Sequence, residues 1–364
     1  MKNSVANVSY HGHKVGRIAM TRDGVCAFEY DADWLDSGFS ISPFKLPLQK
    51  KVFIASRDPF GGNFGVFDDS LPDGWGRLLV DRMLIKKRVN PAEVSIIDRL
   101  AIVGSSGMGA LEYMPQRPLT DVAPADGLES LAGEAEAILN EKYDGKLEEL
   151  AHLGGSSGGA RPKVLIRVDG ADWLVKFKAG VDPRNIGRQE YDYSLTARDA
   201  GLEMPETRLF EGKFFGVRRF DRKPDGEKVF MISASGLLNA SHRLPTLDYN
   251  NLMDATLELT RDYKEAEKMF RLMCFNIFAH NRDDHAKNFS FLYDRGKWSV
   301  SPAYDLVYSE GMGGEHATSV DGEGRNPNEQ NITEVARKAG IDPKTAKRVM
   351  EEVASATDRA KFIK

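Results

Sequence analysis

An apolar segment in the second half of the chain runs directly into a dense group of polar residues. Met269 to Phe278 reads MFRLMCFNIF, and Ala279 to Asp294 reads AHNRDDHAKNFSFLYD. An apolar helix of this kind must be buried against other elements of a core. The polar run that follows is therefore anchored at one end, as loops that bind ligands or carry out catalysis commonly are.

The composition is that of a globular protein with two or three domains. The chain has 364 residues, of which 41% are hydrophobic and 29% are charged, enough for two or three domains of ordinary size. With 50 basic and 54 acidic residues, it lacks the global basic field of many nucleic-acid-binding proteins. Two interpretations of the basic residues on the last helices stay open: a local phosphate-binding patch, or a solvated helix face. These residues are Arg337, Lys338, Lys344, Lys347 and Arg348.

Cysteine usage and hydropathy predict a cytoplasmic protein. Cys26 and Cys274 lie far apart in apolar runs, which argues against a disulfide framework or a zinc site and fits a reducing compartment. The N-terminus has no apolar core of signal-peptide length. No window reaches the ~18 apolar residues of a membrane span, so we expect no membrane partner.

Turn signals and hydrophobic periodicity predict three regions: a mixed region (1–115), a β-rich lobe (116–245) and a helical lobe (246–364). Pro-rich residues 114–125 read as a linker. Three hairpins are expected. The first spans 15–30 and turns at Asp23-Gly24, the second spans 164–177 and turns at Asp169-Gly170, and the third spans 207–220. The expected helices follow Gly74, span 128–150 after a cap at Asp126, span 188–200, and fill most of the chain from 247 onward.

The run Asp283 to Asn288, DDHAKN, has the spacing of a phosphoryl-transfer loop. In such a loop the Asp orients the substrate hydroxyl, and an Asn five positions later binds a metal ion on the phosphates. Two other interpretations stay open. One is a solvated helix end, and the other is a metal site made of His280, Asp283 and His285.

A second carboxylate follows at a fixed distance. Trp298 to Leu306 reads WSVSPAYDL, a β-like run that ends on Asp305, seventeen residues after Asn288. Kinases place a second metal-binding Asp on such a strand, and Mg²⁺ prefers oxygen ligands of this type. Taken alone, an Asp at a strand end is usually a turn former or a helix cap.

A Gly-rich segment, Gly154 to Lys163 (GGSSGGARPK), precedes these residues. Glycines let backbone N–H groups approach phosphates closely. It is not a Walker A loop, because Ala160-Arg161 stand where Lys-Ser/Thr would be; a flexible linker is the alternative. The segment leads into a hairpin that carries Lys176, and Glu190 in the next helix is placed to pair with that Lys.

Together with VRRFDR at Val217 to Arg222, these segments resemble the HipA-like serine/threonine kinases, toxin components of bacterial toxin–antitoxin pairs. SLPDGWGRLLVDRML (70–84) resembles the family's N-terminal subdomain, SSGGARPK its Gly-rich loop, VRRFDR its hinge, NRDDHAKNFSF its catalytic loop and SPAYDL its metal-binding strand. The resemblance implies an α+β, kinase-like two-lobed fold. It would have a β-rich N-lobe, an all-helical C-lobe and an extra mixed α/β N-terminal subdomain.

The resemblance also implies roles for single residues, with ATP and Mg²⁺ as cofactors. Asp283 would be the catalytic base, and Asn288 and Asp305 would hold Mg²⁺. The other implied nucleotide contacts are Lys176 at the phosphates, the backbone of Arg218, Arg219 and Phe220 at the adenine, the loop residues Gly158, Gly159, Ala160, Arg161, Pro162 and Lys163, and His285, Lys287 and Tyr304.

Family members can autophosphorylate a Ser in the Gly-rich loop, which ejects the loop and silences the enzyme. Ser156 occupies the corresponding place here, and Ser157 is its neighbour. A phosphate would add roughly −1.5 to −2 charge beside the ATP phosphates. The loop departs from the commoner family form, since Gly158 replaces a usual Ala and Arg161 a usual Gln.

The resemblance implies a helix-turn-helix antitoxin, HipB-like, as partner, with DNA reached only indirectly through it. The implied substrate is a protein, such as a translation factor or an aminoacyl-tRNA synthetase. Two other functions stay open: a small-molecule kinase, and a pseudokinase that acts as a binding module. The short sequence after Asp305 has no long insertion to enclose a small molecule, which favours a protein substrate.

Overall fold

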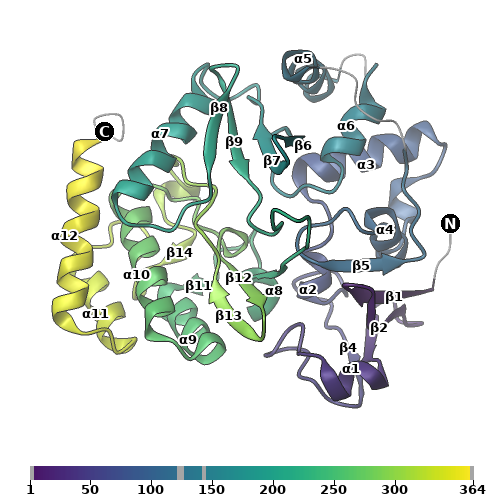
Figure 1. Cartoon of the computed structure of the whole chain (residues 1–364), viewed down its shortest axis with the longest axis horizontal. Coiled ribbons are helices and arrows are strands. Elements are labelled where there is room, and N and C mark those ends of the chain that lie inside the picture. The colour runs from purple at the N-terminus through teal and green to yellow at the C-terminus, as the bar shows by residue number, and fades with distance from the viewer. Residues whose placement is uncertain (1–3, 121–126, 142–144, 361–364) are drawn as a thin grey trace. The chain divides into compact units, whose positions relative to one another are not determined.

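The computed structural model describes residues 4–120, 127–141 and 145–360 (Figure 1). The chain forms two compact units. Unit 1 comprises Met1–Gly187 and Arg208–Phe230, and unit 2 comprises Arg188–Thr207 and Met231–Lys364. The sequence-based division at residues 115 and 245 stays a prediction. None of the helices in the described ranges combines the length and the hydropathy needed to cross a membrane.

Unit 1 begins with a five-stranded sheet of order β4-β3-β2-β1-β5. Its strands are β1 (Val5–Tyr10), β2 (His13–Met20), β3 (Cys26–Tyr30), β4 (Val52–Ile54) and β5 (Leu111–Met114). The predicted hairpin around Asp23-Gly24 is confirmed as β2–β3, and Gly24 has the positive φ (+75°) that favours Gly in such a turn. Alternate residues of β1, Ala6 and Val8, point into the core, as the two-residue period of a strand requires.

The helices of unit 1 are α1 (Ala32–Ser37), α2 (Gly65–Asp68), α3 (Gly74–Lys86), α4 (Ile96–Val103), α5 (Leu128–Leu139) and α6 (Leu147–Gly154), with a 3-10 turn at Pro91–Glu93. The helix predicted after Gly74 is confirmed as α3. The single helix predicted over 128–150 is wrong. α5 ends at Leu139, with Asn140 as its C-cap, and Glu141 has a φ of +56°, which a right-handed helix cannot continue through. The predicted cap, Asp126, lies outside the described residues.

The second sheet of unit 1 has the order β6-β7-β9-β8. It contains β6 (Lys163–Val168), β7 (Ala171–Lys176), β8 (Thr207–Phe210) and β9 (Phe214–Arg218). Asp169 and Gly170 both have positive φ (52° and 78°), as a tight hairpin turn requires. One core joins this sheet to α3, α5 and α6; its members are Trp75, Leu79, Met83, Leu131, Ala135, Ile138, Leu147, Leu150, Leu153, Val164, Trp173, Val175, Phe177 and Phe214.

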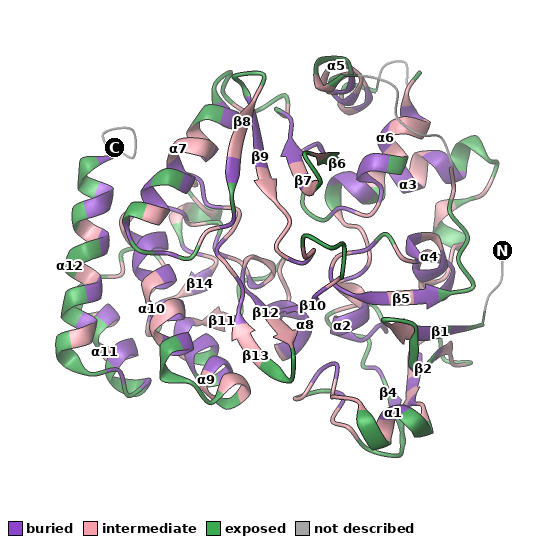
Figure 2. Ribbon diagram, viewed as in Figure 1, coloured by how far each residue is buried: buried purple, intermediate pink, exposed green. Residues whose placement is uncertain are grey.

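Unit 2 is centred on a buried helix, α10 (Tyr263–Phe278), which packs against α9 (Tyr249–Thr260) and α12 (Pro343–Arg359). Its buried residues extend along most of its length (Figure 2), as the apolar segment predicted. The remaining helices are α7 (Ile186–Asp199), α8 (Ala234–Leu238) and α11 (Glu329–Lys338), with 3-10 turns at Ala286–Asn288 and Met312–Gly314.

The prediction of an all-helical C-terminal lobe is wrong. Unit 2 holds a sheet of order β10-β12-β13 and a short parallel pair, β11–β14. The strands are β10 (Phe230–Ser233), β11 (Leu247–Asp248), β12 (Ser290–Asp294), β13 (Lys297–Val300) and β14 (Thr318–Ser319). β12 and β13 form a hairpin whose turn residues, Arg295 and Gly296, both have positive φ. The β-like run predicted to reach Asp305 ends as a strand at Val300.

Candidate active site

The loop after α10 folds back on itself and joins the two ends of the DDHAKN motif. The Asn288 side-chain Nδ2 donates to the Asp283 carbonyl (2.7 Å), and the Asn288 backbone N–H donates to the His285 carbonyl (2.8 Å). His285 starts the 3-10 turn at Ala286–Asn288 and accepts from the Lys287 N–H. The Asp283 side chain is 60% exposed, so its carboxylate lies at the surface of the unit.

Tyr304 ties the segment that carries Asp305 to this loop. Its hydroxyl donates to the Lys287 carbonyl (2.6 Å), one residue before Asn288, and lies 2.6 Å from the Ser290 hydroxyl. Asp305 itself has a φ of +56°. This left-handed conformation is uncommon outside Gly, Asn and Asp, and such residues cluster at functional sites.

The oxygen atoms presented here fit a hard divalent cation. Because the Nδ2 of Asn288 is used by the Asp283 carbonyl, the amide offers its Oδ1 as the ligand atom, and Asp305 offers a carboxylate. Mg²⁺ in phosphotransferases is usually held by one or two protein groups of this type, together with phosphate oxygens and water. Asn288 and Asp305 match that donor set.

The alternative metal site at His280, Asp283 and His285 does not form. Within the described ranges, no three or more His, Cys, Asp or Glu side chains are grouped so that they could hold a metal ion. The His285 Nε2 is 4.0 Å from the Asp283 Oδ1. Burial, together with the charges of Arg282 and His316, lowers the pKa of His280.

The Gly-rich loop separates its two serines. Ser157 is 1% exposed, and its hydroxyl donates to the Gly154 carbonyl (2.6 Å). Ser156 is half-buried. Farther along, Arg161 forms an ion pair with Asp182 (3.1 Å), and Lys163 donates to the Gly158 carbonyl. The structure therefore presents Ser156 more openly than Ser157.

Residues at the start of α3 hold the Gly-rich loop through its backbone. The Gly159 N–H donates to the Asp73 carboxylate, and the Trp75 N–H donates to the Gly159 carbonyl (2.9 Å). The Trp75 indole Nε1–H donates to the Lys163 carbonyl (3.0 Å). The sequence did not predict these three bonds. Their only signal in the sequence is the motif SLPDGW, which contains Asp73 and Trp75.

Two lysines lie directly opposite each other where the Gly-rich loop enters the sheet. Lys163 of β6 pairs in register with Lys176 of β7, and they are 5% and 9% exposed. The register therefore brings two positively charged side chains to one place, and lysine is a common ligand of phosphate groups. The Lys176 ammonium also lies 5.7 Å from the centre of the Phe215 ring. Glu190 is buried on α7, and its pairing with Lys176 stays a prediction.

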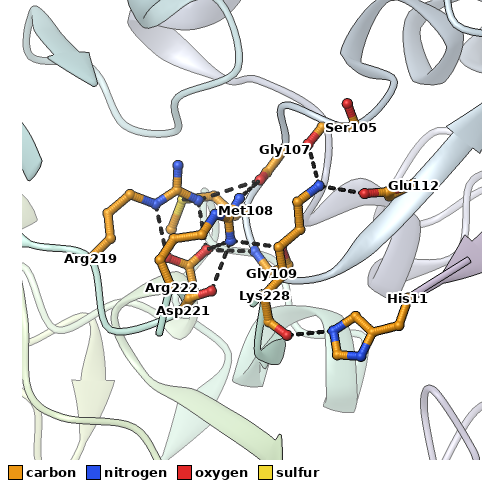
Figure 3. A network of polar contacts seen from close by, with 10 residues as sticks. All are labelled: His11, Ser105, Gly107, Met108, Gly109, Glu112, Arg219, Asp221, Arg222 and Lys228. Atoms are coloured by element: carbon orange, nitrogen blue, oxygen red, sulfur yellow. Dashed lines mark hydrogen bonds and ion pairs between the residues drawn. The ribbon is translucent and has the colours of Figure 1, made fainter. Parts of the chain in front are cut away.

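The hinge segment is fixed by a buried ion cluster with residues 105–109 (Figure 3). The Asp221 carboxylate accepts from Arg219 (2.6 Å), Arg222 (2.8 Å) and the Gly109 N–H (2.8 Å). Burial alone would raise the pKa of Asp221, but the two guanidinium groups and the Gly109 N–H hold it below its ordinary value.

Further contacts in Figure 3 extend this attachment. Arg222 donates to the Gly107 carbonyl (2.9 Å), and Lys228 donates to the Ser105 carbonyl (2.6 Å) and pairs with Glu112 (2.6 Å). The Arg219 backbone N–H donates to the Asp172 carbonyl (2.8 Å). This bond occupies the Arg219 N–H but not its carbonyl, and the predicted adenine contact through the backbone of Arg218, Arg219 and Phe220 stays a prediction.

Comparison with known proteins identifies the family. The HipA N-terminal domain matches residues 6–114, and the HipA-like C-terminal domain matches residues 155–361. The chain belongs to the HipA family. Asp73, Trp75 and residues 105–109 lie in the first matched domain, and Ser156 to Lys163, Val217 to Arg222 and Asp283 to Asn288 lie in the second.

Two known proteins are similar to this chain over most of its length. A protein of Sinorhizobium fredii named "Putative kinase Y4mE" is 27% identical over 336 residues, which cover 83% of this chain and 77% of that protein. The Shewanella oneidensis HipA structure, solved with HipB and operator DNA, matches with a TM-score of 0.73 and 19% identity, covering 99% of this chain and 91% of that one. The second likeness establishes the fold.

Proposed function

We propose that this HipA-family chain is an ATP- and Mg²⁺-dependent protein serine/threonine kinase, the toxin of a toxin–antitoxin module. The observation that carries the proposal is the closure of the catalytic loop. The Asn288 amide is bonded to the Asp283 carbonyl, and Tyr304 ties the Asp305 segment to the preceding residue, Lys287. A base, an amide oxygen and a second carboxylate are the protein groups that phosphoryl transfer requires.

Each residue then has a definite task in the transfer. Asp283 accepts the proton of a Ser or Thr hydroxyl, and its exposure leaves room for a protein side chain. Asn288 and Asp305 would hold Mg²⁺, which would supply positive charge to the phosphates during transfer. Lys163 and Lys176 offer two positive charges to the phosphates, and the Gly-rich loop offers its backbone N–H groups.

We also infer that the chain phosphorylates itself at Ser156. Ser156 is the more exposed of the two loop serines, while the Ser157 hydroxyl is buried on the Gly154 carbonyl. A phosphate on Ser156 would place negative charge in a loop whose proposed ligand is itself a polyphosphate. Repulsion between the two would weaken nucleotide binding.

For partners, the proposal is a HipB-like antitoxin and a protein substrate of the translation machinery. It is supported by membership of the HipA family and by the fold shared with the Shewanella oneidensis HipA, which was solved with HipB and operator DNA. Contact of this chain with DNA would be indirect, through the antitoxin.

The test is radiolabel transfer from γ-labelled ATP in a bacterial extract separated into dialysed protein and low-mass fractions. With Mg²⁺, the wild type is expected to label protein on Ser or Thr. The Asp283→Asn substitution and the addition of a chelator are each expected to abolish this labelling of protein. Label that appears only in the low-mass fraction would favour a small-molecule kinase. Mg²⁺–ATP binding without transfer to either fraction would favour a pseudokinase.

A further inference from the structure

Asp284, the residue after the proposed base, is fully buried and accepts four hydrogen bonds. Its Oδ1 receives the backbone N–H groups of Ala317 (2.8 Å) and Thr318 (3.3 Å). Its Oδ2 lies 2.9 Å from the Tyr249 hydroxyl and 2.9 Å from the His316 Nδ1. A carboxylate with no exposed surface is costly unless it is satisfied in this way.

Two partners of Asp284 are donors by their chemistry, since backbone N–H groups can only donate. Burial and the nearby Asp284 carboxylate raise the pKa of Tyr249 well above its ordinary value, so its hydroxyl stays protonated and donates. The His316 Nδ1 lies 2.9 Å from the oxygen that accepts from Tyr249, and in the Nδ1–H tautomer it donates to that oxygen. The Asp284 backbone carbonyl also receives the Thr318 hydroxyl (2.5 Å).

The hydrogen-bond network around Asp284 continues into α9 and α10. The Asn276 side chain of α10 donates to the Tyr249 hydroxyl of α9 (3.0 Å), and the Asn281 side chain donates to the Asn276 Oδ1 (2.9 Å). The loop is thus attached before Asp283 by Asn281 and after it by Asp284. On the other side, Thr318 belongs to β14, which pairs with β11 just before α9.

Neighbouring side chains in this loop point in opposite directions. Asp283 is exposed, Asp284 is buried, His285 is half-buried and Ala286 is buried. Anchoring the Asp284 carboxylate therefore fixes the backbone from which the Asp283 carboxylate projects. A catalytic group displaced by about 1 Å can lose on the order of 100-fold in rate.

We propose that Asp284 and His316 form a positioning pair that orients the Asp283 carboxylate, an inference that rests on the proposed kinase function. His316 comes from the segment between Asp305 and α11, so the pair couples this segment to the catalytic loop through one buried hydrogen bond. Neither residue touches the reacting atoms. They act through the backbone of the loop.

The side-chain chemistry predicts a specific order of variants at position 316. An Asn places its amide N–H near the position of the imidazole Nδ1 and can still donate to Asp284. A Gln extends its amide to the position of the Nε2, and an Ala donates nothing. At position 284, Asn replaces one acceptor oxygen by an N–H₂ group that faces existing donors.

The experiment measures kcat, the Kd for Mg²⁺–ATP, thermal stability and hydrogen exchange of residues 281–289 in the full chain. Asp284→Asn, His316→Ala and His316→Gln are expected to lower kcat by about 10- to 100-fold, with faster loop exchange and a Kd that changes less than twofold. His316→Asn is expected to restore most of kcat. Asp254→Asn, an exposed change on α9, is the matched control.

The outcomes separate the pair from the proposed function. The proposal that Asp284 and His316 position Asp283 is overturned if His316→Ala and His316→Gln leave the hydrogen exchange of the loop unchanged. It is also overturned if kcat falls only together with the affinity for Mg²⁺–ATP and the melting temperature. A wild type that transfers no phosphate, with loop exchange that still follows the order of the variants, would overturn the kinase function and keep the pair as the anchor of the loop.

Discussion

Lys163 lies directly opposite Lys176 in the antiparallel pair formed by β6 and β7, and both side chains are buried. Two lysines in opposed positions bring positive charge to one place on the strand pair, and lysine is a common ligand of phosphate groups. This relationship gives the nucleotide half of the proposed site a physical basis. Its consequence is measurable at Lys176.

We expect Lys176→Gln to weaken Mg²⁺–ATP binding by at least tenfold, about 1.4 kcal/mol, because one of the two charges is lost. Isothermal titration calorimetry measures the Kd directly. Lys178→Gln changes an exposed lysine two residues away and serves as the control. A Lys176→Gln protein with the wild-type Kd would remove Lys176 from the nucleotide site.

Asp283→Asn is expected to lower phosphotransfer by about 10²- to 10⁴-fold, the usual contribution of a general base. The Asp283 side chain is mostly exposed, so melting temperature and Mg²⁺–ATP affinity should stay at wild-type values. Asp254→Asn is again the matched control. Substantial phosphotransfer by Asp283→Asn would be incompatible with a role as the base.

Asp305→Asn is expected to raise the Mg²⁺ concentration for half-maximal phosphotransfer by at least tenfold, since a charged ligand becomes a neutral one. Asn also tolerates the left-handed backbone that Asp305 adopts (φ +56°), so the fold is preserved. Asp305→Ala would add backbone strain and is a poorer test. An unchanged Mg²⁺ dependence in Asp305→Asn would exclude Asp305 as a ligand.

Gly76→Ala is expected to disturb the Gly-rich loop, although Ala is the better helix former by about 1 kcal/mol. A Cβ at Gly76 would lie 2.3 Å from the Ser157 carbonyl oxygen, so the loop backbone must move. We predict weaker Mg²⁺–ATP binding and faster hydrogen exchange over residues 154–160. Gly133→Ala on α5, where a Cβ meets nothing within 4 Å, should leave both unchanged. Identical behaviour of the two variants would contradict this contact.

Asp221→Asn is expected to destabilise unit 1 by roughly 3 kcal/mol at pH 7, the usual cost of breaking a buried ion pair. The folded pKa of Asp221 lies below the ordinary value of 3.8. The ion cluster thus gives its full stability above about pH 4 and loses it as the pH falls through the folded pKa. Urea unfolding at several pH values should show the difference from wild type shrinking below pH 4. The control is Asp225→Asn, an exposed change in the same segment. A difference independent of pH would contradict this assignment.

Local patterns predicted much of the fold. Alternating apolar residues and the turn residues Asp23-Gly24 and Asp169-Gly170 predicted two hairpins that the structure confirms. The hairpin β12–β13 was missed, although Arg295-Gly296 is a turn of the same kind. The surrounding helical periodicity dominated that interpretation, and β13 was extended to Asp305.

The missed residues act through contacts that are distant in sequence. Gly159 and Asp73 are 86 positions apart, and Asp284 and His316 are 32 apart. Each of these four residues has an ordinary local explanation as a turn, cap or surface residue. Only the folded chain shows that the second carboxylate of the Asp283-Asp284 pair points inward and anchors the loop.

The most direct test of the kinase proposal is the intact mass of phosphatase-treated chain after incubation with Mg²⁺ and ATP, for the wild type and for Asp283→Asn. We predict that the wild type gains one phosphate, located on Ser156, and that Asp283→Asn gains none. Equal phosphate gain in the two proteins, or no phosphate on either the chain or the proteins of an added extract, would contradict a protein kinase acting through Asp283.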